Sequence, residues 1–279
     1  MRPRELSRSM ASFATRTPTL PPATHTNSYA LGSREVLLVE PATPYDDEQR
    51  AWIEWARSLP SSGRFARAIV LTHHHPDHVG GADVLSRELT LPLWAHAETA
   101  SRISTPVTRL LADGDVLDLD GPVPTRWRVL HTPGHAPGHV CLHEASEGAL
   151  VVGDMVASVG TILVDPTDGD MSAYLAQLER LASLGARVAL PAHGEPIDDP
   201  SALFRKYVVH RTMRERRVLD ALARRADGGT AGDLVPDAYD DTPPAIWPIA
   251  ALSVEAHLVK LAREGRVRAT GPSRYIAVR

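Results

Sequence analysis

Residues 72–81 read THHHPDHVGG and follow directly on the apolar run RAIVLT at 67–72. The run is short, rich in apolar residues and bounded by polar ones, which is the pattern of a buried β-strand. The loop behind it contains four histidines and one aspartate within six residues. The stretch therefore predicts a strand that ends in a dense cluster of metal-capable side chains.

The spacing inside this cluster decides which side chains can act together. Side chains of an extended segment alternate between two faces, so His73, His75 and Asp77 should point the same way. His74 should point away from them, and the turn that follows should bring His78 back to the same side. We expect such a cluster to be shared by two metal ions, and the alternative is an ordinary polar loop.

Three further candidate ligands each follow a predicted strand. His135 comes after TRWRVLHTPG, Asp154 ends GALVVGD, and His193 ends ARVALPAH. Loops at strand ends are where α/β proteins collect their ligands. Imidazole and carboxylate groups suit zinc, iron or manganese. Two such ions about 3.5–4 Å apart can hold a hydroxide while polarising a scissile bond, so we expect two divalent metal ions, zinc first, with iron or manganese as alternatives.

The cysteine and most of the other histidines are not expected in this site. Cys141 is the only cysteine, which excludes an intramolecular disulfide and a metal site built from thiolates. Six histidines fit no ligand spacing and are interpreted as structural groups: His25, His96, His131, His143, His210 and His257. Any metal should therefore be held by nitrogen and oxygen.

Hydrophobic periodicity divides the chain into two parts. Strand-like runs in the first part lie at 35–40, 67–72, 125–132, 139–144, 148–154 and 186–193, with amphipathic helices at 46–59 and 171–184 between them. A third helix is expected over 203–226, where it ends before a glycine pair. We draw the boundary near Ala202, which gives a catalytic domain over 1–202 and a smaller domain over 203–279.

The smaller domain has a recognisable order of elements. It reads as a helix at 231–239, a helix at 250–265, a turn, and two short strands at 266–270 and 274–279. This order is typical of a winged helix. We therefore expect an α/β catalytic domain followed by a small winged-helix domain.

Composition and charge limit the classes of function. Apolar residues make up 43% and charged residues 23%, close to the averages of soluble proteins, so a sizeable core can form. No stretch approaches the roughly 18 consecutive apolar residues of a membrane span, and the N-terminal segment lacks the apolar core of a secretory signal. We therefore expect no membrane contact and a cytoplasmic location. Residues 205–279 carry 14 Lys+Arg against 9 Asp+Glu, and residues 1–204 carry 16 against 25, so the tail is basic and the body acidic.

These motifs together resemble a known family. THHHPDHVGG, TPGH, VVGD and LPAHG look like the successive motifs of the metallo-β-lactamase superfamily, over roughly residues 25–200. The resemblance implies an αββα sandwich. It also implies a ligand set: His73, His75 and His135 for one metal, Asp77, His78 and His193 for the other, and Asp154 bridging them. The motif order, the helical segment HRTMRERR at 210–217 and the winged-helix ending are similar to the lactamase-like endoribonuclease branch.

Some positions depart from the family pattern or are ambiguous. Glu40 stands where such proteins usually carry an aspartate that supports the metal loop, and its longer side chain can reach the same place. His139 stands where many relatives place a serine, which makes it a candidate substrate contact, with an ordinary polar role at a strand start as the alternative. Asn27 and Tyr29 match a segment beside the metal site of relatives, although a strand tyrosine more often serves packing.

The site and the charge balance favour one reaction. We expect a hydrolase in which a metal-bound hydroxide attacks an ester or thioester of a small acyl compound, with Asp77 orienting the attacking water. The alternative is a single-strand-specific endoribonuclease, in which the arginines at 211, 214, 216 and 217 pair with phosphates of RNA. The acidic body disfavours a long polyanion, and a small acyl substrate avoids that repulsion.

A different class is a metal- or ligand-sensing regulator whose winged helix binds DNA. A recognition helix should be basic, yet VEAHLVKLARE offers only Lys260 and Arg263 among apolar residues. We therefore expect this helix to pack against the body or against a second subunit, which would make the protein a homodimer.

Overall fold

The computed structural model describes residues 3–278. The chain forms two compact units, and each is treated by itself. The first unit contains residues 3–132, 137–161 and 185–200, and the second contains Pro133–Ala136, Ile162–Leu184 and the chain from Ser201 onward. The second unit therefore includes the predicted helix near 171–184, which the sequence analysis assigned to 1–202. The boundary near Ala202 itself stays a prediction.

The first unit contains two β-sheets. The larger sheet has seven strands, which lie side by side in chain order. They are β1 (Arg4–Glu5), β2 (Met10–Arg16), β3 (His25–Leu31), β4 (Glu35–Val39), β5 (Phe65–Val70), β6 (Leu93–His96) and β7 (Arg109–Leu111). Strands β1 to β4 pair antiparallel, whereas β4 to β7 pair parallel. The parallel pairing of β4 with β5 brings the carboxyl ends of both strands to one edge, and this edge carries the histidine-rich loop.

The smaller sheet has five strands in the order β12-β11-β10-β9-β8. They are β8 (Val116–Leu119), β9 (Thr125–His131), β10 (Val140–Glu144), β11 (Ala149–Gly153) and β12 (Val188–Pro191). Only β11 and β12 pair parallel, with Gly153 opposite Pro191. Asp154 and His193 follow these two strands, so they leave the sheet at the same edge.

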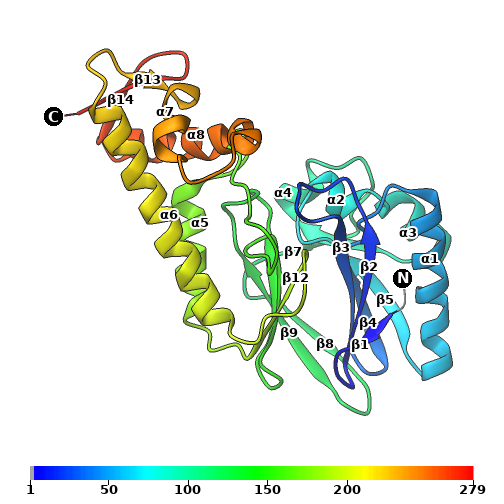
Figure 1. Cartoon of the computed structure of the whole chain (residues 1–279). Helices are drawn as coiled ribbons and strands as arrows, with labels where there is room; N and C mark the ends of the chain where they lie inside the picture. Colours follow the sequence, from blue (N-terminus) through cyan, green and yellow to red (C-terminus); the bar gives the residue numbers. More distant parts are fainter. Residues whose placement is uncertain (1–2, 279) are drawn as a thin grey trace. The chain divides into compact units, whose positions relative to one another are not determined.

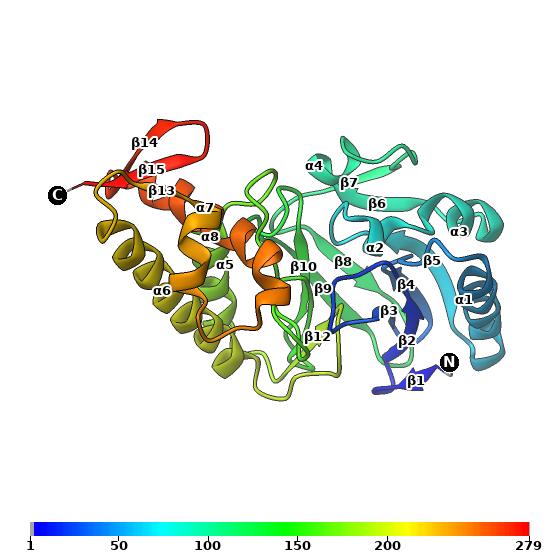
Figure 2. The ribbon, with the colours of Figure 1, turned by 45° about the horizontal axis from the view of Figure 1, so that its top comes forward.

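The sheets of the first unit pack face to face over an apolar core. Leu37 and Val39 from the larger sheet meet Trp127, Leu142 and Val151 from the smaller one, and all five are buried. A second core lies between the larger sheet and the helices α1 (Asp46–Ser58) and α3 (Ala82–Leu89). Figures 1 and 2 show these helices on the outer face of that sheet. The short helices of this unit are η1 (Leu59–Ser62), α2 (Pro76–Val79) and α4 (Ala97–Ala100). The sandwich predicted from the sequence is confirmed.

The second unit is mainly helical. Its elements are α5 (Met171–Ala182), α6 (Pro200–Ala223), β13 (Gly229–Thr230), α7 (Ala231–Ala238), η2 (Pro244–Ile246), α8 (Trp247–Arg263), β14 (Val267–Gly271) and β15 (Arg274–Ala277). The three strands form one antiparallel sheet in the order β13-β15-β14. A core of buried apolar residues joins α6, α7 and α8 to this sheet. Thr230 and Asp233 form a capping box that begins α7. This confirms the predicted winged-helix ending.

One helical stretch departs from the expectation about membrane spans. Pro244–Arg263 is long and apolar enough to cross a bilayer by length and composition alone, with a mean hydropathy of 1.3. Three of its residues, Val254, Leu258 and Leu261, are completely buried in the core of the second unit. We interpret it as a helix that packs on the core of the second unit, because its buried part, 39% of the apolar window, lines that core.

Candidate metal centre

The histidine-rich loop begins where β5 ends and turns sharply into α2. Pro76 occupies the first turn of α2, where its fixed backbone angle favours the helix, and the backbone N–H of His78 donates to the carbonyl of His75 at 2.9 Å. This single turn brings Asp77 and His78 back toward the preceding strand end. Nε2 of His73 lies 3.1 Å from Nδ1 of His75, as alternation requires, and the His74 ring also approaches His75, with 4.8 Å between the ring centres.

The glycine pair after the cluster lets α2 approach the loop behind β4. A Cβ atom on Gly81 would lie 2.8 Å from the carbonyl oxygen of Thr43 and 3.0 Å from that of Pro41. The backbone N–H of Gly81 donates to Pro41 at 2.8 Å. Only a residue without a side chain fits this approach, which fixes the cluster against the neighbouring strand end.

His78 lies at the centre of the cluster and is completely buried. Its Nδ1 is 3.2 Å from a carboxylate oxygen of Glu40, and its Nε2 is 3.8 Å from Asp77 and 3.6 Å from Asp154. Burial by itself would lower the pKa of His78, but the carboxylates of Glu40, Asp154 and Asp77 raise it well above its usual value. The surroundings of His78 therefore favour positive charge strongly.

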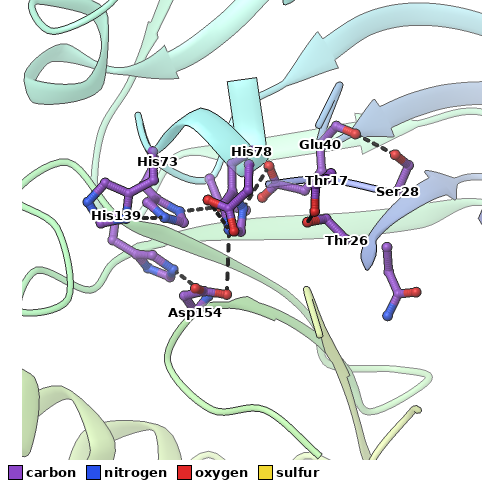
Figure 3. A network of polar contacts seen from close by, with 12 residues as sticks. Thr17, Thr26, Ser28, Glu40, His73, His78, His139 and Asp154 are labelled. Atoms are coloured by element: carbon purple, nitrogen blue, oxygen red, sulfur yellow. Dashed lines mark hydrogen bonds and ion pairs between the residues drawn. The ribbon is translucent and has the colours of Figure 1, made fainter. Parts of the chain in front are cut away.

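Glu40 reaches His78 from an unusual backbone conformation. Its φ angle is 64°, in the left-handed region, and its carbonyl accepts a hydrogen bond from the Ser28 hydroxyl. That hydroxyl in turn accepts from Trp52 Nε1 at 2.7 Å. The network in Figure 3 runs from Ser28 through Glu40 to His78. The longer side chain of glutamate thus reaches the metal loop, as expected for the residue that replaces the usual aspartate.

His193 enters the site from the end of β12. Its Nδ1 lies 2.9 Å from the carbonyl of His25, so this nitrogen donates its proton there and Nε2 is left as the acceptor. Nε2 lies 3.4 Å from Asp154 and 3.6 Å from Asp77. Burial would lower the pKa of His193, but the carboxylate of Asp154 raises it above its usual value. Conversely, burial would raise the pKa of Asp154, but His193 and His78 hold it well below its usual value.

The donor set fits a divalent cation. Ligand atoms of Asp77, His78 and His193 all lie within 4.8 Å of one another. Within residues 3–278, neither nitrogen of the buried His78 and neither carboxylate oxygen of Glu40 has a partner at hydrogen-bond geometry. Leaving buried polar atoms in this state is costly. A cation beside Nε2 would satisfy the nitrogen and balance the carboxylates, in a set of nitrogen and oxygen ligands typical of zinc, iron or manganese.

Two residues near β12 were ambiguous in the sequence and have a clear position in the structure. Tyr29 donates to the carbonyl of Pro191 at 2.7 Å, and the Asn27 amide donates to the carbonyls of Pro191 at 3.0 Å and Gly194 at 2.8 Å. They hold the turn that carries His193. Thr19, which the sequence analysis missed, places its hydroxyl 3.4 Å from His193 Nε2.

His139 lies next to the cluster but does not face solvent. Its ring is completely buried, its Nε2 accepts from the backbone N–H of Asp154 at 3.0 Å, and its Nδ1 lies 2.8 Å from the Thr132 hydroxyl. Both ring nitrogens are thus occupied, and Figure 3 shows the ring beside Asp154. The suggestion of a substrate contact is therefore replaced by a positioning role, because the ring fixes the backbone of a predicted ligand.

His135, the remaining predicted ligand, belongs to the second unit. Its Nδ1 lies 2.8 Å from the carbonyl of Leu163, which leaves Nε2 as the nitrogen for a metal. That it joins His73 and His75 in one metal site stays a prediction.

The arginines of α6 do not form the phosphate-binding face that the sequence suggested. Arg211 is 2% exposed and Arg214 is 5% exposed. Arg214 donates to the carbonyl of Ala238 and to Asp241, and Arg217 pairs with Asp240. Only Arg216 is largely exposed. The end of α7 and the segment after it hold Arg214 and Arg217, and the segment before α5 holds Arg211, so of these four arginines Arg216 alone faces mostly solvent.

The basic residues of α8 are also engaged within the second unit. Lys260 donates to Glu215 at 2.7 Å, and Arg263 pairs with Asp170. Both residues thus have a carboxylate partner, and α8 contains no further lysine or arginine. This disfavours α8 as the recognition helix that the regulator hypothesis requires.

The first unit thus has the architecture of a metal-dependent hydrolase, with a buried set of imidazole and carboxylate groups at one edge of a two-sheet sandwich. Residues 21–193 match the model of the metallo-beta-lactamase superfamily, and residues 230–274 match a beta-lactamase associated winged helix domain. The chain therefore belongs to the metallo-beta-lactamase superfamily.

Individual relatives agree with this assignment. The chain is 31% identical to the beta-lactamase-like protein 2 homolog of Drosophila melanogaster, over 87% of this chain and 84% of that one. It is 30% identical to the lactamase-like protein adaB of Aspergillus niger, over 91% and 81%. A metallo-beta-lactamase family protein from Thermus thermophilus has a similar structure, with a TM-score of 0.80 and 28% identity over 98% of this chain and all of that chain.

Proposed function

We propose that this hydrolase uses two divalent metal ions, zinc in the first instance, to hydrolyse an ester or thioester of a small acyl compound. His73, His75 and His135 would hold one ion, and Asp77, His78 and His193 the other, with Asp154 between them. Such ions lower the pKa of water and polarise the scissile carbonyl group. The observation that carries the proposal is the buried surplus of carboxylates around His78.

The residues of the chain have separate tasks in this reaction. Asp154 and His193 contact each other at 3.4 Å and would fix the second ion, while Glu40 holds His78 from behind. Asp77 is the most accessible carboxylate of the group, with 16% of its side chain exposed. It is therefore best placed to orient the attacking water and to accept its proton.

Charge supports a small acyl substrate over RNA. The body is acidic, and a long polyanion would be repelled except close to the metal ions. The arginines that could have offset this repulsion are committed to partners inside the second unit, Arg214 to Asp241 and Arg217 to Asp240. The basic tail therefore offers RNA fewer contacts than its formal charge indicates.

The proposal is tested by metal analysis together with parallel activity assays. The purified protein is analysed by mass spectrometry for bound metal, stripped with a chelator and reconstituted with zinc, iron or manganese. Each form is assayed against a panel of acyl thioesters and esters and against single-stranded RNA, with Asp77→Asn as the inactive control. Two metal equivalents and metal-dependent turnover of a thioester or ester are expected. Metal-dependent cleavage of RNA alone would overturn the acyl assignment in favour of an endoribonuclease.

A further inference from the structure

We infer that Arg211, on helix α6 of the second unit, is a positioning residue for the metal ligand His135. It acts through the backbone carbonyls of Ile162 and Leu163 rather than by touching the metal or the substrate. The inference rests on the proposed function, because it takes His135 as a ligand. It gives helix α6 a task in orienting a predicted metal ligand of its own unit, and it removes Arg211 from the set of nucleic-acid contacts.

A hydrogen bond to the chain before α5 orients the ring of His135. Its Nδ1 donates to the carbonyl of Leu163 at 2.8 Å, and the ring is buried. This bond fixes both the tautomer and the direction of Nε2. A histidine ligand depends on such an outer partner for its orientation and its basicity. The position of the Leu163 carbonyl therefore controls the position of the ligand nitrogen.

Arg211 holds the neighbouring carbonyl. Its guanidinium donates to the carbonyl of Ile162, and the residue is 2% exposed. The same guanidinium lies over the ring of Tyr174, at 5.7 Å from the ring centre. A buried guanidinium needs hydrogen-bond partners, so this contact is strongly preferred once α6 has packed. Because Ile162 and Leu163 are adjacent, fixing one carbonyl restricts the other.

The turn carrying His135 is fixed from a second direction in the same unit. The backbone N–H of Asp170 donates to the carbonyl of Gly134 at 2.8 Å, and Arg263 of α8 pairs with the Asp170 side chain. Gly134 has a φ angle of 138°, and a Cβ there would lie 2.3 Å from the backbone of Tyr174. The turn therefore rests on α5, while α6 and α8 hold the groups around it.

A purely structural role for Arg211 can be separated from a positioning role, because the same helix contains a matched arginine. Arg214 is buried to a similar degree, donates to the carbonyl of Ala238 at 2.9 Å and lies 4.3 Å from the centre of the Tyr239 ring. These contacts lie toward α7 and the chain after it. Loss of either arginine should lower the stability of the protein. Only loss of Arg211 should change the orientation of the His135 ring.

The experiment compares Arg211→Met with Arg214→Met in the full-length protein. Zinc dissociation constants of the metal-free proteins are measured by competition with a chromogenic chelator, Co²⁺ absorption spectra report the ligand geometry, and thermal unfolding reports stability. We expect both variants to melt earlier than the wild type. Arg211→Met should raise the dissociation constant of one zinc ion about 10–100-fold, as the loss of a hydrogen-bond partner behind a metal ligand does. It should also change the Co²⁺ spectrum. Arg214→Met should keep the wild-type constants and spectrum.

Arg211→Lys provides a second variant should the methionine protein not fold. A lysine can place one donor near the carbonyl of Ile162 but lacks the planar fork of arginine, so we expect an intermediate zinc affinity. Equal zinc binding in the wild type and the Arg211 variants would overturn the inference, and so would equal weakening in the Arg211 and Arg214 variants. A wild-type protein that binds no metal would instead refute the proposed function, so the two failures are distinguishable.

Discussion

Two completely buried histidines, one in each unit, occupy opposite electrostatic environments. His78 is surrounded by the carboxylates of Glu40, Asp77 and Asp154, and its pKa is raised well above the usual value. Burial lowers the pKa of His257, and although Glu215 opposes this effect, the nearby Arg211 and Lys260 add to it. Both side chains are imidazoles with the same intrinsic pKa, so their charged neighbours decide the difference between the two pKa values.

The comparison separates a site prepared for a cation from a network that is already balanced. In the second unit, Glu215 accepts from Lys260 at 2.7 Å and from Arg266 at 2.9 Å, so its charge is compensated within the chain. In the first unit, the charge partners of Glu40 and Asp77 in the structure are histidines. Carboxylates in such a site whose charge partners are imidazoles gain strongly from an added divalent ion.

The most severe test of this comparison removes a carboxylate that contacts both His78 and His193. Asp154→Asn should abolish turnover, because a proposed metal ligand is lost. Metal binding should weaken by more than about 10–100-fold, which is the effect of losing a residue that only supports a ligand. Chelator competition and metal analysis measure the effect. Glu215→Gln is the matched control, and metal content that falls equally in both variants would remove the distinction between the two networks.

A narrower test addresses Asp77 within the carboxylate-rich site. Asp77→Asn should reduce turnover by about 10²–10⁴-fold, the range for loss of an acid/base group. Metal content should fall less than in Asp154→Asn, because Asp154 is proposed to lie between both ions, whereas Asp77 is proposed to hold only one of them. The measurement is kcat with metal content determined on the same sample. Unchanged turnover would exclude Asp77 from the mechanism.

The balanced network should be visible in the response of stability to acid. Burial would raise the pKa of Glu215, but the neighbouring His257, at 3.7 Å, and Lys260, at 2.7 Å, lower it from 4.5 to about 2. A depressed carboxylate pKa stabilises the fold above pH 4.5, and this contribution is lost as the pH falls from 4.5 toward 2. Glu215→Gln should therefore destabilise the protein at neutral pH and flatten its stability curve over that window. Parallel urea titrations of both proteins at several pH values measure this, and identical curves would contradict it.

The smallest effect is expected at an arginine of α6 that belongs to neither network. Arg216 has 85% of its side chain exposed and lies 4.0 Å from Asp220. Arg216→Gln should change the free energy of unfolding by less than about 0.5 kcal/mol, as surface substitutions usually do. Thermal unfolding and a fluorescence assay of single-stranded RNA binding report the result. A large loss of RNA affinity would revive the endoribonuclease alternative.

The sequence predicted the sandwich and the cluster because both depend on local patterns. Strand β5 and the loop behind it are encoded by an apolar run and by alternation, and the structure brings His73 and His75 together as alternation requires. Strands β1, β2, β6, β7 and β8 were missed. Four of them have only two to four residues, too few to establish a period of two, whereas the seven residues of β2 are mostly small or polar and give a weak apolar signal.

Other features depend on contacts between distant residues, which a single sequence does not reveal. The spacing of Arg211 and Arg214 gave the helical face on which they lie, but not what packs against that face. Likewise, nothing local indicates that His139 is buried against the backbone of Asp154, fifteen residues later. The position of His139 beside a family motif indicated that it lies near the site. It did not indicate what the side chain does there.

The burial of Cys141 has a practical consequence for chemical labelling. The single thiol of the chain lies inside β10 with no exposed surface, beside the Thr132 hydroxyl at 3.4 Å. A thiol must reach solvent as the thiolate to react with a maleimide or an iodoacetamide. The native protein should therefore resist such reagents while folded, and one cysteine engineered at an exposed position would carry a fluorophore or spin label alone. A single chosen site of this hydrolase can thus be labelled in solution without first removing a native thiol.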